Sequence, residues 1–213
     1  MRITVFGATG RTGTPFLEQS LAAGHDVIGF VRDPAKLGIE DDRLSIVQGD
    51  VRDADAVERA VAGADAVVSV LGHTDPSDDD VLEVGGRNMI DAMRTHGVDR
   101  FVTLVGAGVR HENDDPGLGG KLMGVLLRTM AGDLLEDSKA QVELLRATDL
   151  DWMVVRAPRL TEGDHTGAHR SGYLSLGVRD SVSRADVADF MLDLATGDEA
   201  VNEMPVITAR GAS

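Results

Sequence analysis

Residues 3–13 read ITVFGATGRTG, a strand-like run that opens directly into three glycines, Gly7, Gly10 and Gly13. At such a junction backbone N–H groups can approach a pyrophosphate closely, and the positive end of the following helix lies behind them. The spacing Gly-x-x-Gly-x-x-Gly is one residue longer than the usual dinucleotide fingerprint, so the prediction also depends on the residues after the loop. Pro15 suits the first turn of a helix, and Gly24 stands where that helix would end. We therefore predict a dinucleotide-binding loop between a first strand and a first helix.

The second strand places charged residues where an adenosine ribose would lie. Residues 25–31 complete a β-α-β unit, and Arg32 and Asp33 follow it. An acidic residue there accepts the ribose hydroxyls of NAD, whereas an arginine accommodates the 2′-phosphate of NADP. Because Asp33 precedes Pro34, we expect it to cap the next turn, which leaves Arg32 and Arg11 to bind the phosphate. The sequence thus predicts NADP(H) in preference to NAD(H). The alternative is that Arg32 is a solvated surface charge.

The composition excludes several classes of function. The chain has 213 residues, no cysteine and a formal net charge of −15 at pH 7. Without cysteine there is no disulfide, no thiolate nucleophile and no cysteine-ligated metal. The negative charge repels nucleic acid and anionic membranes. No stretch approaches the ~18–20 apolar residues of a membrane span, and the chain opens on a strand, so we expect a cytoplasmic protein.

The balance of acidic and basic residues suggests the salt conditions in which the protein works. Aspartate is abundant, whereas lysine is confined to Lys36, Lys121 and Lys139. A highly charged, hydrated surface keeps proteins soluble at high salt, so this balance suggests adaptation to a saline interior. An acidic protein of ordinary salt tolerance is the alternative.

The rest of the chain alternates between strand-like and helix-like segments. Short apolar runs typical of buried strands lie at residues 44–48, 66–71, 101–105, 152–156 and 206–208. Helical patterns cover residues 54–62, 80–96 and 121–148, the last interrupted near Gly132, and a capping box at Ser183–Asp186 opens a final helix. Parallel neighbours require crossover connections, so this alternation predicts an α/β fold. We predict a single doubly wound Rossmann domain over residues 1–213, with a mostly parallel sheet and helices on both faces.

Ligands of such a sheet bind beyond the carboxyl ends of its strands. The segments after those ends include three expected substrate-side loops at residues 72–80, 106–120 and 157–182. The last two exceed the usual connection of ~4–6 residues, which favours a role in binding over mere connection. We expect these loops to build the pocket for a substrate.

Several motifs resemble those of the atypical short-chain dehydrogenases/reductases, most closely the NmrA-like and biliverdin-reductase-B/flavin-reductase-like group. They are GATGRTG at 7–13, VRD at 31–33, GDV at 49–51, LDW at 150–152 with RAP at 156–158, and SRADVA at 183–188. The similarity spans nearly the whole chain. It implies phosphate contacts from Gly7, Thr9, Gly10, Arg11, Thr12 and Gly13. It also implies that Arg32 binds a 2′-phosphate and that Asp50 and Val51 contact adenine. The strand end at Leu71 and Gly72 is expected to lie beside the nicotinamide ribose.

The catalytic part departs from this family pattern. Short-chain dehydrogenases use a serine after the fifth strand and a Tyr-x-x-x-Lys motif to transfer a proton. Here Val105-Gly106 stands at the serine position, and Leu135 replaces the tyrosine while Lys139 is retained. The sole tyrosine, Tyr173, has no lysine four residues later. The resemblance leaves two functions open: a reductase that passes hydride directly to a planar acceptor such as a flavin or quinone, or a non-catalytic NADP(H)-binding redox sensor.

Three side chains remain candidates for catalysis. His73 follows the fourth strand and His111 follows the fifth, so both could donate a proton near neutral pH, and ordinary solvated histidines are the alternative. Lys139 is expected to contact the nicotinamide ribose, with an exposed helix lysine as the alternative. His165 and His169 have a spacing that permits a metal, but without a strong ligand cluster we predict none. The expected partner is a small planar molecule, and the protein is expected to be a monomer or small homo-oligomer.

Overall fold

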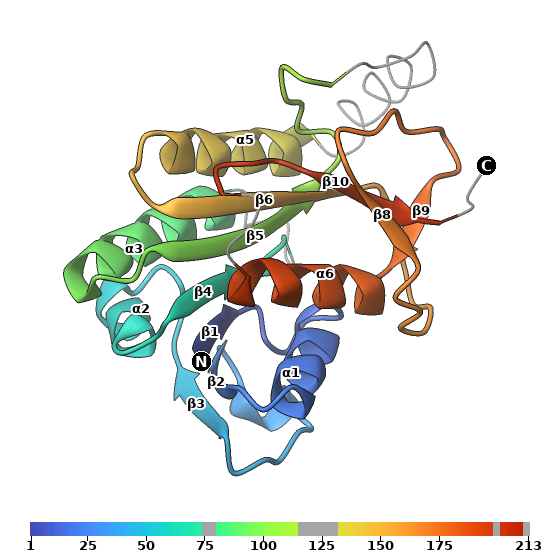
Figure 1. Ribbon diagram of the computed structural model, residues 1–213. Coiled ribbons are helices and arrows are strands. Elements are labelled where there is room, and N and C mark those ends of the chain that lie inside the picture. Colours follow the sequence, from blue (N-terminus) through green and yellow to red (C-terminus); the bar gives the residue numbers. More distant parts are fainter. Residues whose placement is uncertain (74–79, 115–131, 198–200, 211–213) are drawn as a thin grey trace.

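The computed structural model describes residues 1–73, 80–114, 132–197 and 201–210 (Figure 1). Its centre is an eight-stranded sheet in the order β3-β2-β1-β4-β5-β6-β10-β8. Six parallel strands form most of it: β1 (Arg2–Phe6), β2 (Asp26–Val31), β3 (Leu44–Gln48), β4 (Ala66–Ser69), β5 (Arg100–Gly106) and β6 (Asp151–Ala157). The order 3-2-1-4-5-6 is that of a doubly wound Rossmann fold, which confirms the predicted fold.

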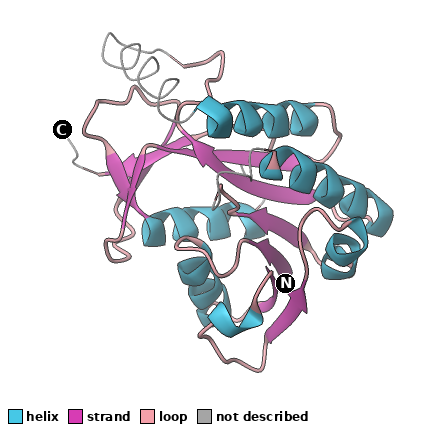
Figure 2. Ribbon diagram, turned by 180° about the vertical axis from the view of Figure 1, so that it is seen from behind, coloured by secondary structure: helices cyan, strands magenta, loops and turns pink. Residues whose placement is uncertain are grey.

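Helices cover both faces of the sheet (Figures 1 and 2). On one face lie α2 (Ala54–Val61), α3 (Val81–His96) and α5 (Gly132–Arg146), and on the other lie α1 (Gly13–Ala22) and α6 (Arg184–Thr196). Side chains of a strand alternate between two apolar layers, so Val67 of β4 joins the α2–α3–α5 layer and Val68 joins the α1–α6 layer. In the described ranges no helix combines the length and apolar character needed to cross a bilayer.

The first β-α-β unit forms as the sequence predicts. α1 begins at Gly13 and ends before Gly24, whose φ of +87° lies in the left-handed region that favours glycine. The carboxylate of Asp33 accepts the backbone N–H of Ala35 at 3.1 Å and caps the short 3-10 helix η1 (Pro34–Lys36). Asp33 is thus engaged in the turn, as predicted.

Two predicted boundaries differ in the structure. β4 ends at Ser69 rather than at residue 71, although the backbone N–H of Val70 still donates to the carbonyl of Phe6 at 3.0 Å. Just beyond the strand, the backbone of Val70 lies against Gly7 of the glycine loop. The predicted helix over 121–148 is α5 from Gly132 onward. Its residues 121–131, like residues 74–79 and 115–120 of the predicted loops, lie outside the described residues.

The segment 157–182, expected as one loop, contains further short strands. β7 (Arg159–Thr161) and β9 (Ser181–Ser183) pair in parallel as a separate small sheet. β8 (His169–Gly172) joins the main sheet, antiparallel to β10 (Val206–Ala209), which lies parallel to β6. Segments this short and polar have no apolar alternation, so the sequence pattern could not reveal them.

Candidate functional site

The predicted phosphate loop lies at the carboxyl end of β1, which has β2 on one side and β4 on the other. This is the topological switch point where ligands of such sheets bind. Gly7 has a φ of +85°, and a Cβ on it would lie 3.0 Å from the backbone carbonyl of Val70. A Cβ on Gly13 would lie 2.1 Å from the carbonyl oxygen of Gly7. Loop, helix and the end of β4 therefore approach so closely that side chains at these positions are excluded.

Other residues that the resemblance assigns to a cofactor follow neighbouring strands at this edge. Arg32 follows β2 directly, and its carbonyl accepts a hydrogen bond from the Gln48 side chain at 3.1 Å. Asp50 accepts the backbone N–H of Arg52 at 2.9 Å. A Cβ on Gly85 would lie 3.2 Å from the side chain of Val51 and 3.6 Å from that of Leu71, so the Val51 and Leu71 side chains both lie against α3 at this glycine.

A charged network that the sequence did not predict joins the phosphate loop to α6. Arg11, expected at the 2′-phosphate, donates through Nη1 to Glu162 Oε1 at 3.1 Å. The same oxygen accepts Nε–H of Arg184 at 2.9 Å, and Arg184 Nη1 donates to Thr12 Oγ1 at 3.2 Å. The side chain of Arg184 is 13% exposed, whereas those of Arg11 and Glu162 are 74% and 61% exposed.

The loop that carries Glu162 is fastened to α6 by a second contact. Asp186 is buried, and its carboxylate accepts the backbone N–H groups of Thr166 and Gly167 at 2.7 and 3.0 Å. Ser183 Oγ accepts the backbone N–H of Asp186 at 3.0 Å, which confirms the predicted helix cap. The segment after β7 is therefore positioned by the first turn of α6.

His73 is held by a carboxylate that the sequence did not single out. Its Nε2 lies 2.7 Å from Oδ2 of Asp137, and the side chain of Asp137 is 1% exposed. The same carboxylate accepts the backbone N–H groups of Leu82 and Glu83 at 2.9 and 2.8 Å, at the start of α3. Asp137 thus fixes both the helix terminus and the imidazole. No sequence signal marks it, because its partners lie 54 to 64 residues away along the chain.

Lys139 lies two residues beyond Asp137 in α5. Its ammonium group forms an ion pair with Glu136 Oε1 at 2.7 Å, and the side chain is 37% exposed. This geometry is that of a partly exposed helix lysine. Leu135, at the position of the family's tyrosine, packs against the apolar layer between the sheet and α2, α3 and α5.

A further polar cluster has the buried Arg156 of β6 at its centre. Its Nε donates to the carbonyl of Met204 at 2.7 Å and its Nη1 to that of Val109 at 3.1 Å. Both Nη atoms also donate to the carboxylate of Asp114, at 2.6 and 2.7 Å. Burial alone would raise the pKa of Asp114, but hydrogen bonds from Arg156 and from the backbone N–H of His111, with the guanidinium charge, hold it below its ordinary value.

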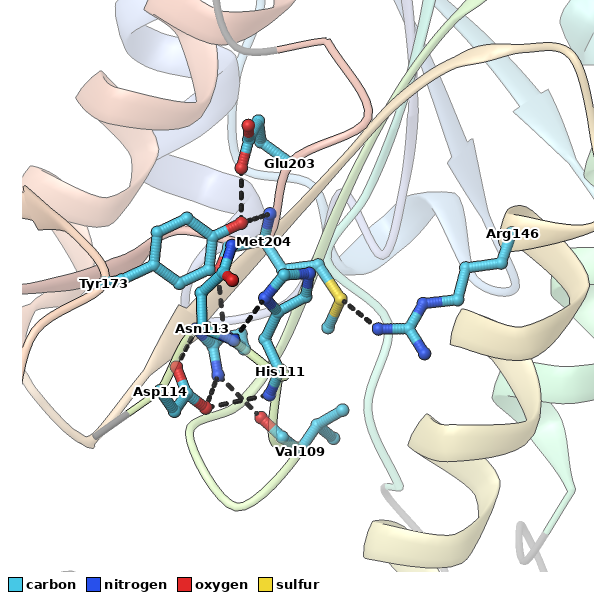
Figure 3. Close-up of polar contacts among 9 residues, drawn as sticks. Val109, His111, Asn113, Asp114, Arg146, Tyr173, Glu203 and Met204 are labelled. Atoms are coloured by element: carbon cyan, nitrogen blue, oxygen red, sulfur yellow. Dashed lines mark hydrogen bonds and ion pairs between the residues drawn. The ribbon is translucent and has the colours of Figure 1, made fainter. Parts of the chain in front are cut away.

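His111 and Tyr173 belong to this Arg156 cluster, apart from the His73–Asp137 pair. Their ring centroids are 4.8 Å apart, and the phenol of Tyr173 donates to the carboxylate of Glu203 (Figure 3). Burial, followed by this hydrogen bond, raises the pKa of Tyr173. A tyrosine that passes a proton in a short-chain dehydrogenase needs the opposite shift.

The two histidines considered for a metal have other neighbours. His165 Nε2 lies 3.1 Å from Asp189 Oδ2, and the ring of His169 packs on Phe190 with centroids 5.3 Å apart. Over the residues that the structure describes, no group of three or more acidic, histidine or cysteine side chains could hold a metal ion.

Comparison with known proteins places this geometry in a family. Cinnamoyl-CoA reductase 1 of rice (Oryza sativa subsp. japonica) is 34% identical over 121 residues, which cover 52% of this chain and 36% of that protein. The chain spans less than half the length of such curated relatives. Among solved structures, the anaerobillin reductase ChuY from Escherichia coli O157:H7 superposes with a TM-score of 0.80 at 21% identity, over 100% of this chain and 99% of that one. The oxidoreductase ylbE from Lactococcus lactis gives 0.80 at 22% identity, over 100% and 93%.

These two structures share the Rossmann fold with this chain. The model of a family described as NAD(P)H-binding matches residues 7–198, from the first glycine of the phosphate loop to just beyond α6. The protein therefore belongs to this NAD(P)H-binding family, in agreement with its resemblance to the atypical short-chain dehydrogenases/reductases.

Proposed function

We propose that this protein is an NADP(H)-dependent oxidoreductase that reduces a planar acceptor, such as a flavin or quinone, by direct hydride transfer. The observation that carries the proposal is the phosphate loop, where a Cβ on Gly7 or Gly13 would meet backbone atoms at 3.0 Å or less. This loop belongs to a chain of the NAD(P)H-binding family. Two of the similar proteins are described as reductases and one as an oxidoreductase, which supports redox chemistry and leaves the acceptor open.

The preference for NADP(H) is supported by the end of β2. Asp33, which could accept ribose hydroxyls, instead accepts the backbone N–H of Ala35. Arg32 stands between this turn and the strand, at the position where a guanidinium suits a 2′-phosphate. A dehydrogenase with an acidic residue free at this point would favour NAD instead.

A planar acceptor is proposed because the conventional acids are missing. Val105-Gly106 replaces the serine, and Leu135 is packed into the apolar layer. A nicotinamide supplies the hydride when bound, so the residues here need to bind, orient and shield the acceptor. The segments after β4, β5 and β6 would do this, with substrate and cofactor held in contact between them.

His73 is the proposed auxiliary proton donor. The buried carboxylate of Asp137 accepts Nε2–H of the imidazole at 2.7 Å and fixes the ring, so Nδ1 could donate a proton when the ring is in its imidazolium form. His111 instead packs on Tyr173 in the Arg156 cluster. A planar conjugated acceptor can also take its proton from water, so His73 would assist the reaction without being indispensable.

The missing acids also favour a second candidate, an NADP(H)-binding redox sensor without turnover. One experiment separates the two. NADPH oxidation is followed by absorbance with a panel of flavins, quinones and tetrapyrroles at low and molar salt, alongside calorimetric titration with NADPH. Turnover with one acceptor class supports the reductase. Tight binding with no turnover on any class supports the sensor, and absence of NADPH binding contradicts both.

A further inference from the structure

Arg184 is a nearly buried cation that touches the phosphate loop. It is the first residue of α6, its side chain is 13% exposed, and its Nη1 reaches Thr12 Oγ1 at 3.2 Å. Thr12 is the N-cap residue of α1, yet its hydroxyl caps no backbone N–H of that helix, and the first turn of α1 holds no acidic residue. The hydroxyl instead accepts a hydrogen bond from the guanidinium of Arg184, beside the phosphate loop.

Two guanidinium groups converge on one point beside Thr12. Oε1 of Glu162 accepts from Arg11 at 3.1 Å and from Arg184 at 2.9 Å. A single carboxylate neutralises one of these two positive charges and leaves the other in excess. This local excess of positive charge contrasts with the net charge of the whole chain, which is −15. A group with more negative charge and more acceptor oxygens than a carboxylate would satisfy both arginines better.

The carboxylate of Glu162 can leave its place between Arg11 and Arg184. Its side chain is 61% exposed, so it can return to water at little cost, whereas Arg184 is enclosed and stays in place. Pairs with an exposed partner are weak and exchange readily, and a phosphate gives shorter, charge-assisted hydrogen bonds to guanidinium. Of the phosphates of a dinucleotide, the pyrophosphate is the one that lies at the start of the first helix.

We propose that Arg184 binds the pyrophosphate of the cofactor together with Arg11, and that Glu162 is a built-in counter-ion which the pyrophosphate displaces. The inference rests on the proposed function only in its use of the dinucleotide site. It adds a binding residue and a competing anion that the glycine motif does not contain. Because Glu162 lies just beyond β7, its release leaves a carboxylate of the segment after β6 without its two arginine partners.

The test uses dissociation constants of the full chain for NADP and NAD, measured by calorimetry, and needs no acceptor. Glu162→Gln removes the competing charge and should tighten both cofactors on the order of three- to tenfold. Asp164→Asn removes an equal charge from an exposed position two residues further on and should leave both constants unchanged. Arg184→Gln should weaken both cofactors roughly ten- to a hundredfold. Inorganic pyrophosphate should compete with NADP in the wild-type protein and less well in Arg184→Gln.

Several outcomes would overturn the inference. One is an unchanged or weaker affinity in Glu162→Gln, and another is an equal gain in Glu162→Gln and Asp164→Asn, which would mark a general charge effect. If Arg184→Gln loses affinity for NADP but not for NAD, Arg184 contacts the 2′-phosphate, and the pyrophosphate assignment is contradicted. Thermal melting confirms that each variant is folded, and Glu162→Gln alters only an exposed side chain. If the wild-type protein binds neither cofactor, the proposed function fails; if it binds both and Glu162→Gln has no effect, only this inference fails.

Discussion

Among the three glycines of the phosphate loop, Gly13 has the least space for a side chain. A Cβ there would lie 2.1 Å from the carbonyl oxygen of Gly7 and 2.8 Å from that of Ala8. Gly13→Ala should therefore displace the loop and lower NADPH affinity at least about tenfold, with a loss of unfolding free energy above ~1 kcal/mol. Calorimetric titration and thermal unfolding measure the two effects. Gly38→Ala is the matched control, because a Cβ at Gly38 has no neighbour within 4 Å. Wild-type affinity in Gly13→Ala would contradict the assignment of the loop.

Arg32 offers a test of cofactor choice. Replacing it with alanine should remove a charge-assisted contact with the 2′-phosphate worth ~1.5–3 kcal/mol, or roughly ten- to a hundredfold in NADP affinity. The affinity for NAD should stay the same, since NAD has no phosphate at that position, and this makes NAD the internal control. Equal affinities of the wild-type protein for the two cofactors would refute the preference.

His73 tests how protons reach the acceptor. We expect His73→Gln to lower kcat by less than the ~10²–10⁴-fold typical of a general acid, because orientation and water exclusion supply most of the rate. The NADPH dissociation constant should be unchanged. The measurement is kcat on whichever acceptor proves active. A thousandfold loss of kcat with intact cofactor binding would instead make His73 the essential proton donor.

Residue-level prediction of local structure succeeded for the helix caps formed by Asp33 and Ser183. The glycine loop can be recognised in the sequence because Gly7, Gly10 and Gly13 all stand where a Cβ would lie within 3.0 Å of backbone atoms. Glu162 and Arg184 could not be recognised in this way, since the contact of Arg184 with Thr12 joins residues 172 positions apart. Asp137 was overlooked for the same reason: nothing within α5 distinguishes it from a solvated acid.

At the scale of elements, Arg156 ties two segments to β6. Its guanidinium holds the carbonyls of Val109 and Met204 as well as the carboxylate of Asp114. The loop after β5 and the approach to β10 are therefore anchored through one buried side chain. Replacing its counter-ion should affect stability far more than replacing a surface ion pair.

Asp114→Asn should lower the unfolding free energy by about 3–5 kcal/mol at neutral pH, because it leaves Arg156 buried without its counter-charge. The folded pKa of Asp114 lies below its ordinary value of 3.8, so its contribution is present above about pH 4 and is lost as the pH falls through the folded pKa. Urea unfolding followed by the fluorescence of Trp152 should thus show a shallower acid dependence in the variant than in the wild-type protein. A parallel pH dependence in the two proteins would argue against this.

Glu143→Gln provides the control for that experiment. Glu143 accepts from Arg146 at 2.9 Å in an exposed ion pair, with side chains 69% and 38% exposed. Such pairs contribute ~0–1 kcal/mol, so the variant should unfold much as the wild-type protein does.

Elements with their own apolar pattern were predicted well. The buried runs of β2, β5 and β6 appear in the sequence to within about a residue or two of their ends, because burial on both faces demands continuous apolar side chains. β7, β8 and β9 are three or four residues long and contain no continuous apolar run, and tertiary pairing makes them strands.

At the scale of the whole molecule, alternation of strands and helices predicted a doubly wound, mostly parallel sheet, and the structure confirms it. The net charge of −15 is a property of the same scale, and its consequence is still a prediction. Repulsion among surface carboxylates weakens the folded state at low ionic strength and is screened by salt.

The melting temperature should therefore rise between low salt and molar potassium chloride. Differential scanning calorimetry measures it, with NADPH absent so that ligand binding does not contribute. A control protein near electrical neutrality should shift much less. If the melting temperature stays constant or falls, adaptation to high salt is excluded as the reason for the acidic surface.

The position of β8 bears on how copies of this protein meet. Within the described residues β8 has one sheet neighbour, β10, so its outer side offers unpaired N–H and C=O groups to any extended chain. Its four residues include Arg170 and no large apolar side chain, and the φ of +128° at Gly172 turns the backbone as the strand ends. A strand this short and charged is a poor template for a second copy. The outer side of β8 therefore disfavours the backbone hydrogen bonds through which the sheets of two copies would join.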